Sequence, residues 1–228
     1  MAWRSGRVKS TERPFRVLRL ALPFLAVVLA AAGWASAGFI AYQVPAGTNG
    51  NQAHGGPLGM DLDLSKMIII TSLGVFDDGS NGLTRTLNVR LYDRTDTSSP
   101  LASLTFTPED PGELIGGSRF KDLPSPLSFM PGFQGTIVAD GYGTGEQNGN
   151  GMGSGVSWTT DGAGGVIAFV GASRWGMTAG TYPTNLDSGP ANRYAAGTFE
   201  YNLPEPATVT LLGLGAAGLL IRRRRNAR

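Results

Sequence analysis

Two neighbouring carboxylates are the first candidates for metal chemistry. Asp77 and Asp78 open the loop Asp-Asp-Gly-Ser-Asn-Gly at residues 77–82, and calcium prefers carboxylate and carbonyl oxygens. The loop lacks the oxygen-bearing residues at alternating positions and the final glutamate of an EF-hand loop. Asp-Gly and Asn-Gly, in contrast, favour tight turns. Asp61 and Asp63 would add ligands only if the fold brought them near. We therefore predict a hairpin turn, with calcium as the alternative and no other metal.

Catalytic residues are not indicated by any spacing in the chain. There is one histidine, His54, no cysteine, and no Gly-x-Ser-x-Gly sequence, which argues against a nucleophile with its base. Two carboxylates can form a glycosidase, but no spacing singles out a pair. The glycine-rich residues 141–155 lack the Gly-Lys-Ser/Thr ending and the following helix of a phosphate-binding loop. We expect no enzyme activity and no cofactor.

Aromatic residues provide a candidate for ligand binding. Trp158, Trp175, Tyr182 and Tyr194 lie in the second half of the chain near glycine-rich loops. An exposed aromatic face stacks on a sugar ring, and Trp158 and Trp175 are the two residues we single out for this role. The alternative is that both tryptophans belong to the core, since large aromatics dominate the burial of a β-sandwich.

The elements that must position these residues show a β pattern. Leu83, Leu87, Val89 and Leu91 are apolar and alternate with polar residues, a period of two that predicts a half-buried strand. Arg85 is the one break in that alternation. Turn sequences such as Asp-Gly, Asn-Gly and Pro-Gly separate the remaining apolar runs, at 39–44, 58–64, 67–76, 101–106, 135–140, 155–159, 165–170 and 198–202.

About nine short strands with no convincing internal helix predict an all-β fold. We expect an antiparallel β-sandwich, of jelly-roll type, over residues 38–203. With 34 glycines in 228 residues and no cysteine, the composition favours turn-rich β structure without disulfides. This segment carries 8 Lys/Arg and 15 Asp/Glu, a net charge of −7. Nucleic-acid binding is disfavoured, because it requires a cationic face.

Residues 1–37 have the features of a secretory signal peptide. Six Lys/Arg precede an apolar run at residues 20–32, and Ala35-Ser36-Ala37 precedes Gly38. Small residues at Ala35 and Ala37 predict cleavage by signal peptidase before Gly38. The alternative is a transmembrane anchor, but thirteen apolar residues are fewer than the roughly 20 that a bilayer needs. No arginine pair precedes the run, which favours the general secretory route.

The C-terminus, residues 204–228, has three consecutive parts. Pro204, Glu205 and Pro206 form an extended segment that a processing enzyme can bind. Residues 207–221 are apolar, and a helix of fifteen residues spans about 22 Å, less than the roughly 30 Å hydrocarbon core. Four arginines follow and favour the cytoplasmic side: Arg222, Arg223, Arg224 and Arg225. We predict a temporary membrane anchor; a buried helix with a basic tail is the alternative, weakened by apolar residues on every face.

This tail, over residues 203–226, resembles the PEP-CTERM sorting signal of Gram-negative bacteria that make exopolysaccharide. The resemblance implies recognition of Pro204, Glu205 and Pro206 by an exosortase, a membrane-embedded cysteine protease-transpeptidase. It further implies transient inner-membrane insertion through residues 207–221, a stop at the four arginines, and transfer to the cell surface or extracellular matrix. Cargo domains of this class are diverse and include β-sandwich ectodomains, so the resemblance assigns a destination and no activity.

Two functions remain open from the sequence. The first is an exported, non-enzymatic surface or matrix protein with a structural or adhesive role in an exopolysaccharide or biofilm, with exopolysaccharide as a possible partner. The second is a secreted polysaccharide-active hydrolase. A concave cleft lined by paired carboxylates would favour the second function.

Overall fold

The structure is a computed structural model of the chain, and it describes residues 38–151, 159–160, 165–189 and 192–204. The predicted signal peptide, residues 1–37, lies outside the described residues, as do Trp158 and the predicted membrane segment at 207–221. In the part that is described, no helix is long and apolar enough to cross a membrane.

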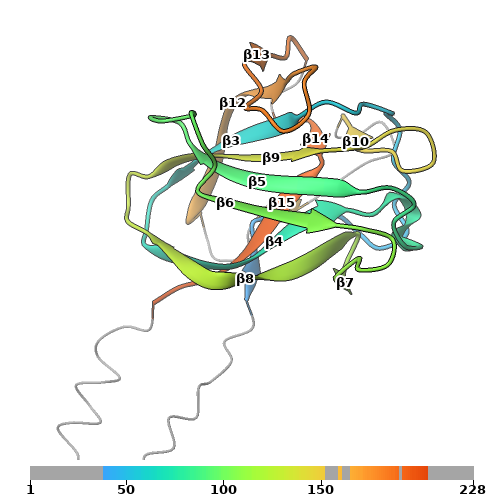
Figure 1. The fold of residues 1–228 in the computed structure, drawn as a ribbon. Coiled ribbons are helices and arrows are strands. Elements are labelled where there is room, and N and C mark those ends of the chain that lie inside the picture. The colour runs from blue at the N-terminus through green and yellow to red at the C-terminus, as the bar shows by residue number, and fades with distance from the viewer. Residues whose placement is uncertain (1–37, 152–158, 161–164, 190–191, 205–228) are drawn as a thin grey trace, which may run out of the picture. The chain divides into compact units, whose positions relative to one another are not determined.

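The described chain is all-β, and every paired strand is antiparallel (Figure 1). Its one helical element is the single turn η1 (Asp78–Ser80). Two large sheets hold most of the strands. The five-stranded sheet has the order β1 (Phe39–Ile40), β15 (Gly197–Asn202), β4 (Ile68–Phe76), β8 (Ser118–Phe129), β7 (Glu113–Ile115). The six-stranded sheet has the order β13 (Asn185–Leu186), β12 (Ile167–Trp175), β3 (Leu58–Leu64), β9 (Gln134–Asp140), β5 (Leu87–Asp93), β6 (Ala102–Phe106).

Two short pairs complete the described strands. β10 (Gly149–Asn150) pairs with β14 (Tyr194–Ala195), and β11 (Thr159–Thr160) pairs with β2 (Tyr42–Gln43). The first and the last described strands lie in the same sheet, because β1 pairs with β15, with Phe39 opposite Tyr201.

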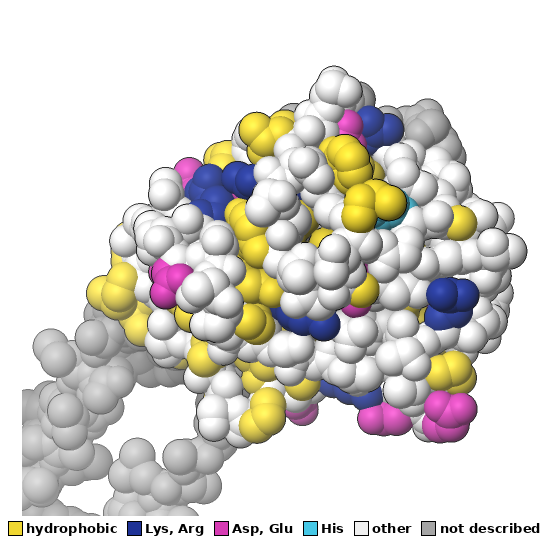
Figure 2. Space-filling model, turned by 45° about the horizontal axis from the view of Figure 1, so that its top comes forward, with side chains coloured by type: hydrophobic (Ala, Val, Ile, Leu, Met, Phe, Trp, Pro, Cys, Tyr) yellow, Lys and Arg dark blue, Asp and Glu magenta, His cyan; other side chains and the backbone are white. Residues whose placement is uncertain are grey.

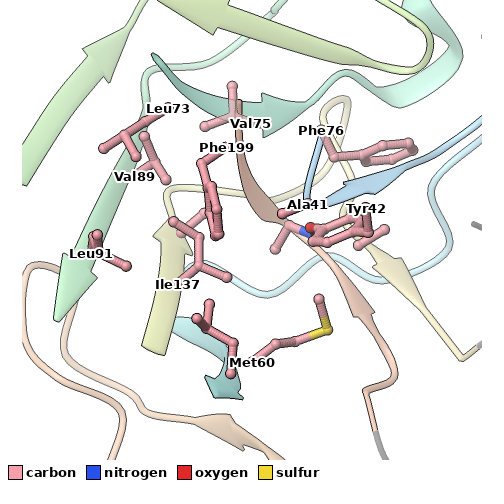
Figure 3. Close-up of a cluster of buried hydrophobic side chains, with 14 of the residues drawn as sticks. Ala41, Tyr42, Met60, Leu73, Val75, Phe76, Val89, Leu91, Ile137 and Phe199 are labelled. Atoms are coloured by element: carbon pink, nitrogen blue, oxygen red, sulfur yellow. The ribbon is translucent and has the colours of Figure 1, made fainter. Parts of the chain in front are cut away.

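The core lies between the two large sheets, and strands such as β3 and β5 contribute every second residue to it. Leu87, Val89 and Leu91 of β5 are fully buried, as the period-two pattern predicts. They meet side chains of β4, β9 and β15, among them Leu73, Ile137 and Phe199 (Figure 3). Gly197 lies at a close approach of the sheets, because a Cβ there would be 3.2 Å from the Cβ of Ala139 on β9.

Most predicted strands are present with shifted ends. β12 runs five residues beyond its predicted end at residue 170, and β5 begins four residues after its predicted start. Leu83 was predicted to begin this strand, but β5 begins at Leu87. Residues 83–86 form a loop because the Thr84 amide donates to Glu146 Oε2 at 2.8 Å and Arg85 Nε donates to the Gly141 carbonyl at 2.9 Å. Arg85, the break in the alternation, thus belongs to the loop.

Strand β8 was not predicted, because Pro124 and Pro126 argue against a strand. It pairs with β4 through residues 118–122 and again through residues 127–129, with a register shift between the two stretches. Both prolines fall in the unpaired interval, where a missing backbone N–H breaks no ladder hydrogen bond. The shift thus permits a strand of 12 residues that contains two prolines.

Candidate functional site

A cavity of about 540 Å³ lies where β3 begins and β12 ends. Its lining comes from stretches that are far apart in the sequence. The apolar lining residues are Leu58, Trp175, Met177 and Leu186, and the polar ones are Gln52, His54, Asp187, Ser188 and Tyr194.

Strand β12 delivers Trp175 to this cavity. Trp175 is the last residue of the strand and pairs with Leu58 of β3 and with Asn185 of β13. The register of β12 against β3 shifts between Val170 and Arg174, and Gly171 within that shift has φ +67°, which favours glycine. Trp175 is partly buried and packs against the core, so one side chain serves both as core and as cavity wall.

The imidazole of His54 is fixed against Trp175. Its Nε2 lies 2.9 Å from the Gly176 carbonyl oxygen, and the two rings meet edge to face with centroids 6.4 Å apart. Because a carbonyl only accepts, Nε2 is the donor in this contact. The imidazole ring is therefore held against the aromatic wall of the cavity.

The single carboxylate of the cavity, Asp187, is held by three donors. Tyr194 donates its hydroxyl to Oδ2, while the Gly189 amide at 2.8 Å and Arg193 at 3.1 Å reach Oδ1. Burial alone would raise the pKa of Asp187, but these hydrogen bonds and the Arg193 charge outweigh it and lower the pKa. Burial, together with the hydrogen bond to Asp187, raises the pKa of Tyr194. Asp187 is thus a fixed anion and Tyr194 a neutral phenol.

The carboxylates of the cavity can be compared with those that a glycosidase uses. General acid-base hydrolysis of a glycoside uses two carboxyl groups roughly 5 to 10 Å apart. The lining of the cavity contains one carboxylate, Asp187, and its oxygens already accept three hydrogen bonds.

A second polar cluster lies on the six-stranded sheet, outside the cavity. Asp61 is 4% exposed and accepts from Arg174 Nε at 2.8 Å and from the Thr136 hydroxyl at 2.5 Å. Tyr182 packs against Arg174, with the guanidinium carbon 5.4 Å from the ring centroid, and its hydroxyl lies 3.1 Å from that of Thr136. Asp63 pairs with Arg94. Asp61, Asp63 and Tyr182 thus serve to fix strands and a loop.

The predicted calcium residues, Asp77 and Asp78, both bind backbone amides. Asp77 is fully buried, contacts Arg119 Nε at 2.7 Å and accepts from the amides of Asn81 and Gly82. Asp78 accepts from the amides of Gly50 at 2.7 Å and Gln147 at 3.0 Å. These bonds connect three loops. The predicted hairpin is wrong, because the loop leads from β4 in one sheet to β5 in the other and the two strands do not pair.

Glu146 lies beside this pair, and its oxygens also bind backbone amides. It accepts from the amides of Asp78 and Thr84, and burial raises its pKa. In the described part of the chain, no group of three or more His, Cys, Asp or Glu residues is arranged to hold a metal ion.

The C-terminal motif begins where the fold ends. β15 ends at Asn202, Leu203 still packs against the core, and Pro204 is exposed. Glu205, Pro206, residues 207–221 and Arg222, Arg223, Arg224 and Arg225 lie outside the described residues.

At the other end of the domain, Ala35 and Ala37 also lie outside the described residues. Gly38 lies next to β15, because a Cβ on it would be 3.8 Å from Glu200 Oε1 and 3.9 Å from Asn202 Oδ1. The predicted cleavage site and the sorting motif therefore adjoin the same edge of the domain.

Sequence reasoning identified part of the cavity. It singled out Trp175 and noted Tyr194, but Met177, Leu186 and Asp187 were missed because an isolated Met, Leu or Asp after a strand has no distinctive pattern. Trp158 lies outside the described residues. The close spacing of Met177, Leu186 and Asp187 to Trp175 and Tyr194 was the only indication available in the sequence.

Comparison with known proteins identifies the tail. A family model of the PEP-CTERM protein-sorting motif matches residues 202–225. No curated protein matches the chain. The motif implies an exosortase as processing partner and an exported protein that transits the membrane to the cell surface.

Proposed function

We propose that this chain, a PEP-CTERM sorting-domain protein, is a non-enzymatic component of the cell surface or extracellular matrix, with a structural or adhesive role in an exopolysaccharide or biofilm. The observation that carries the proposal is the direct junction of the motif and the fold. The family match begins at Asn202, which is also the last residue of β15. A folded β domain is thus joined to its sorting motif without a spacer.

The placement of the two ends supports a route through the membrane. Because β1 pairs with β15, residue 38 and residue 203 leave the domain at one edge (Figure 1). A precursor with a signal peptide before residue 38 and a membrane segment after residue 206 can therefore keep this edge toward the inner membrane. The route we propose includes general secretion, cleavage by signal peptidase and transient anchoring in a Gram-negative inner membrane.

The jelly-roll arrangement is part of this proposal. Successive strands β3, β4 and β5 alternate between the two sheets, and so do β6, β8 and β9. The orders β1-β15-β4-β8 and β3-β9-β5-β6 are those of two interleaved Greek keys. Strands β12 and β13 then extend the six-stranded sheet beyond β3 and build the cavity wall.

The alternative function is a secreted polysaccharide hydrolase. It requires a second carboxyl group across a cleft from the first. Among the described residues the cavity has one carboxylate, Asp187, and this favours the adhesive proposal.

The deciding experiment compares cells with and without their exosortase. The wild-type chain should reach the surface only when the exosortase is present, and Glu205→Ala should remain in the membrane fraction. Glu109→Ala, at an exposed carboxylate of the domain, is the matched control and should sort normally. Equal surface levels in both strains would refute the proposed route. Release of reducing ends from polysaccharide by the surface form would favour the hydrolase.

A further inference from the structure

The lining of the cavity is divided between apolar and polar groups. Trp175, Met177 and Leu186 offer apolar surface, while Asp187, Ser188 and Gln52 offer hydrogen-bonding groups. A pyranose ring has the same division, with C–H faces that stack on aromatic and aliphatic side chains and hydroxyls around its edge. The cavity volume of about 540 Å³ lies within the range of small-ligand sites, roughly 300 to 1,000 Å³.

The apolar lining is exposed to an unusual degree. Met177 is 77% and Leu186 is 61% exposed, and they belong to the five large exposed hydrophobic residues of the described chain. Single exposed apolar residues are normal, but these two lie on one cavity with Trp175. Figure 2 shows hydrophobic side chains gathered against the histidine near the top of the domain. Covering this surface with a ligand would remove apolar area from water.

Contacts within the protein position Trp175, His54 and Asp187 in the cavity before any ligand binds. Trp175 is held by strand pairing to Leu58 and Asn185, and its ring meets His54, which is fixed by the Gly176 carbonyl. Asp187 is held by three donors. A preorganised site loses little conformational entropy on binding, which suits weakly apolar ligands such as sugars.

The charge of the cavity selects among saccharides. Among the described residues of its lining, one is an anion, Asp187, and none is a lysine or arginine. Arg193, which neutralises Asp187 at 3.1 Å, is also committed to Asn150 through Nε at 2.6 Å. A uronate, phosphate or sulfate group would meet a fixed carboxylate without a free cation beside it, whereas a neutral hydroxyl can donate to that carboxylate.

We propose that this cavity binds a neutral pyranose unit of a polysaccharide. One face of the ring stacks on Trp175 and is bordered by Met177 and Leu186, and the ring hydroxyls bond to Asp187 and to the polar groups beside it. The inference deepens the proposed function, since it supplies the adhesive contact. It is tested on purified protein, so its failure would leave the sorting route untouched.

The test uses the full chain in mild detergent and titrates it with neutral glucose hexamers, β-1,4 and α-1,4 linked, and with an alginate hexamer as the anionic probe. Calorimetry and tryptophan fluorescence should report saturable binding of a neutral hexamer and at least tenfold weaker binding of alginate. Trp175→Ala should weaken binding by about tenfold or more, the value of a lost aromatic stack. Trp175→Phe should recover part of it.

Two exposed residues at the rim of the cavity, Met177 and Leu186, can be replaced without disturbing the hydrophobic core. Met177→Ser and Leu186→Ser should each weaken binding several-fold with unchanged circular dichroism, because both side chains are mostly in solvent. Met130→Ser and Leu101→Ser, at exposed hydrophobics outside the cavity, are the matched controls and should bind as wild type. Absence of binding to every neutral hexamer, stronger binding of alginate, or equal losses in rim and control variants would overturn the proposal.

Discussion

Two buried tyrosines test which hydrogen bonds stabilise the start of β15. Each hydroxyl accepts from a backbone amide, but among the described residues only one of these two amides has a second acceptor. Tyr42 accepts from the Ala196 amide at 3.0 Å and donates to the Gly197 carbonyl at 2.6 Å. Tyr142 accepts from the Phe76 amide at 3.0 Å and donates to the Ala196 carbonyl at 2.8 Å. Both side chains are almost completely buried.

Replacing each tyrosine by phenylalanine removes one hydroxyl, but the two replacements should lower the free energy of unfolding by different amounts. After Tyr142→Phe, the Phe76 amide still donates to the Ala196 carbonyl at 2.9 Å, so the loss is one ordinary hydrogen bond, about 1 kcal/mol. After Tyr42→Phe, the Ala196 amide has no other hydrogen bond among the described residues and stays buried without a partner. That penalty brings the expected loss to about 2 to 3 kcal/mol of unfolding free energy.

The assay is equilibrium urea unfolding of residues 38–203, followed by circular dichroism and by fluorescence. Coincident transitions from both probes would justify a two-state analysis. Tyr42→Phe should shift the midpoint more than Tyr142→Phe at an unchanged slope, with a difference of about 1 kcal/mol. Equal shifts, or the reverse order, would refute the reasoning from the unpaired Ala196 amide.

Further predictions concern pH, charge and metal. Burial raises the pKa of Tyr42 and Tyr142, so their neutral forms stabilise the fold below the unfolded pKa of about 10; above it, urea unfolding should show a loss of up to about 1.4 kcal/mol per pH unit for each tyrosine. Asp61→Ala should cost about 2 to 3 kcal/mol, because it leaves Arg174 partly buried without its carboxylate, whereas Asp63→Ala, at a 40% exposed side chain, should cost under about 1 kcal/mol in the same assay. A chain that begins at Gly38 places its ammonium beside Glu200, whose pKa is raised by burial. The pair should add about 0.5 kcal/mol at pH values between the pKa of Glu200 and an amine pKa of about 8, and it should be lost as pH rises through the amine pKa. Melting of the same chain extended by Ala-Ser-Ala provides the comparison. Because Asp77 and Asp78 are engaged by amides, the melting temperature of residues 38–203 should be the same in calcium and in chelator, and a rise with calcium would restore the metal hypothesis.

The strands and the sorting motif are the parts that the sequence could predict, because both depend on neighbours along the chain. The alternation over Leu87, Val89 and Leu91 follows from the pleat of a strand, and all three residues are buried. Glycine-based turns mark the ends of most strands for the same local reason. The C-terminal motif is a continuous stretch of sequence, and a family model matches it directly.

The ends of the strands and the existence of β8 could not be predicted, because they depend on contacts with residues far away in the sequence. Glu146 holds residues 83–86 out of β5 from a position more than 60 residues away. Pro124 and Pro126 are tolerated because the pairing of β8 with β4 shifts around them. The intrinsic preference of proline opposes a strand here, and β8 forms because β4 pairs with it on both sides of the prolines.

The cavity was decided by tertiary structure alone. His54, Trp175 and Tyr194 are brought together by the pairing of β12 with β3 and by the short pair of β10 with β14. The sequence named Trp175 as a candidate but could not distinguish core from ligand wall, and in the fold the residue serves as both. Residue type determines what a side chain can bind, whereas long-range strand pairing determines which side chains share a surface and which of them water can reach.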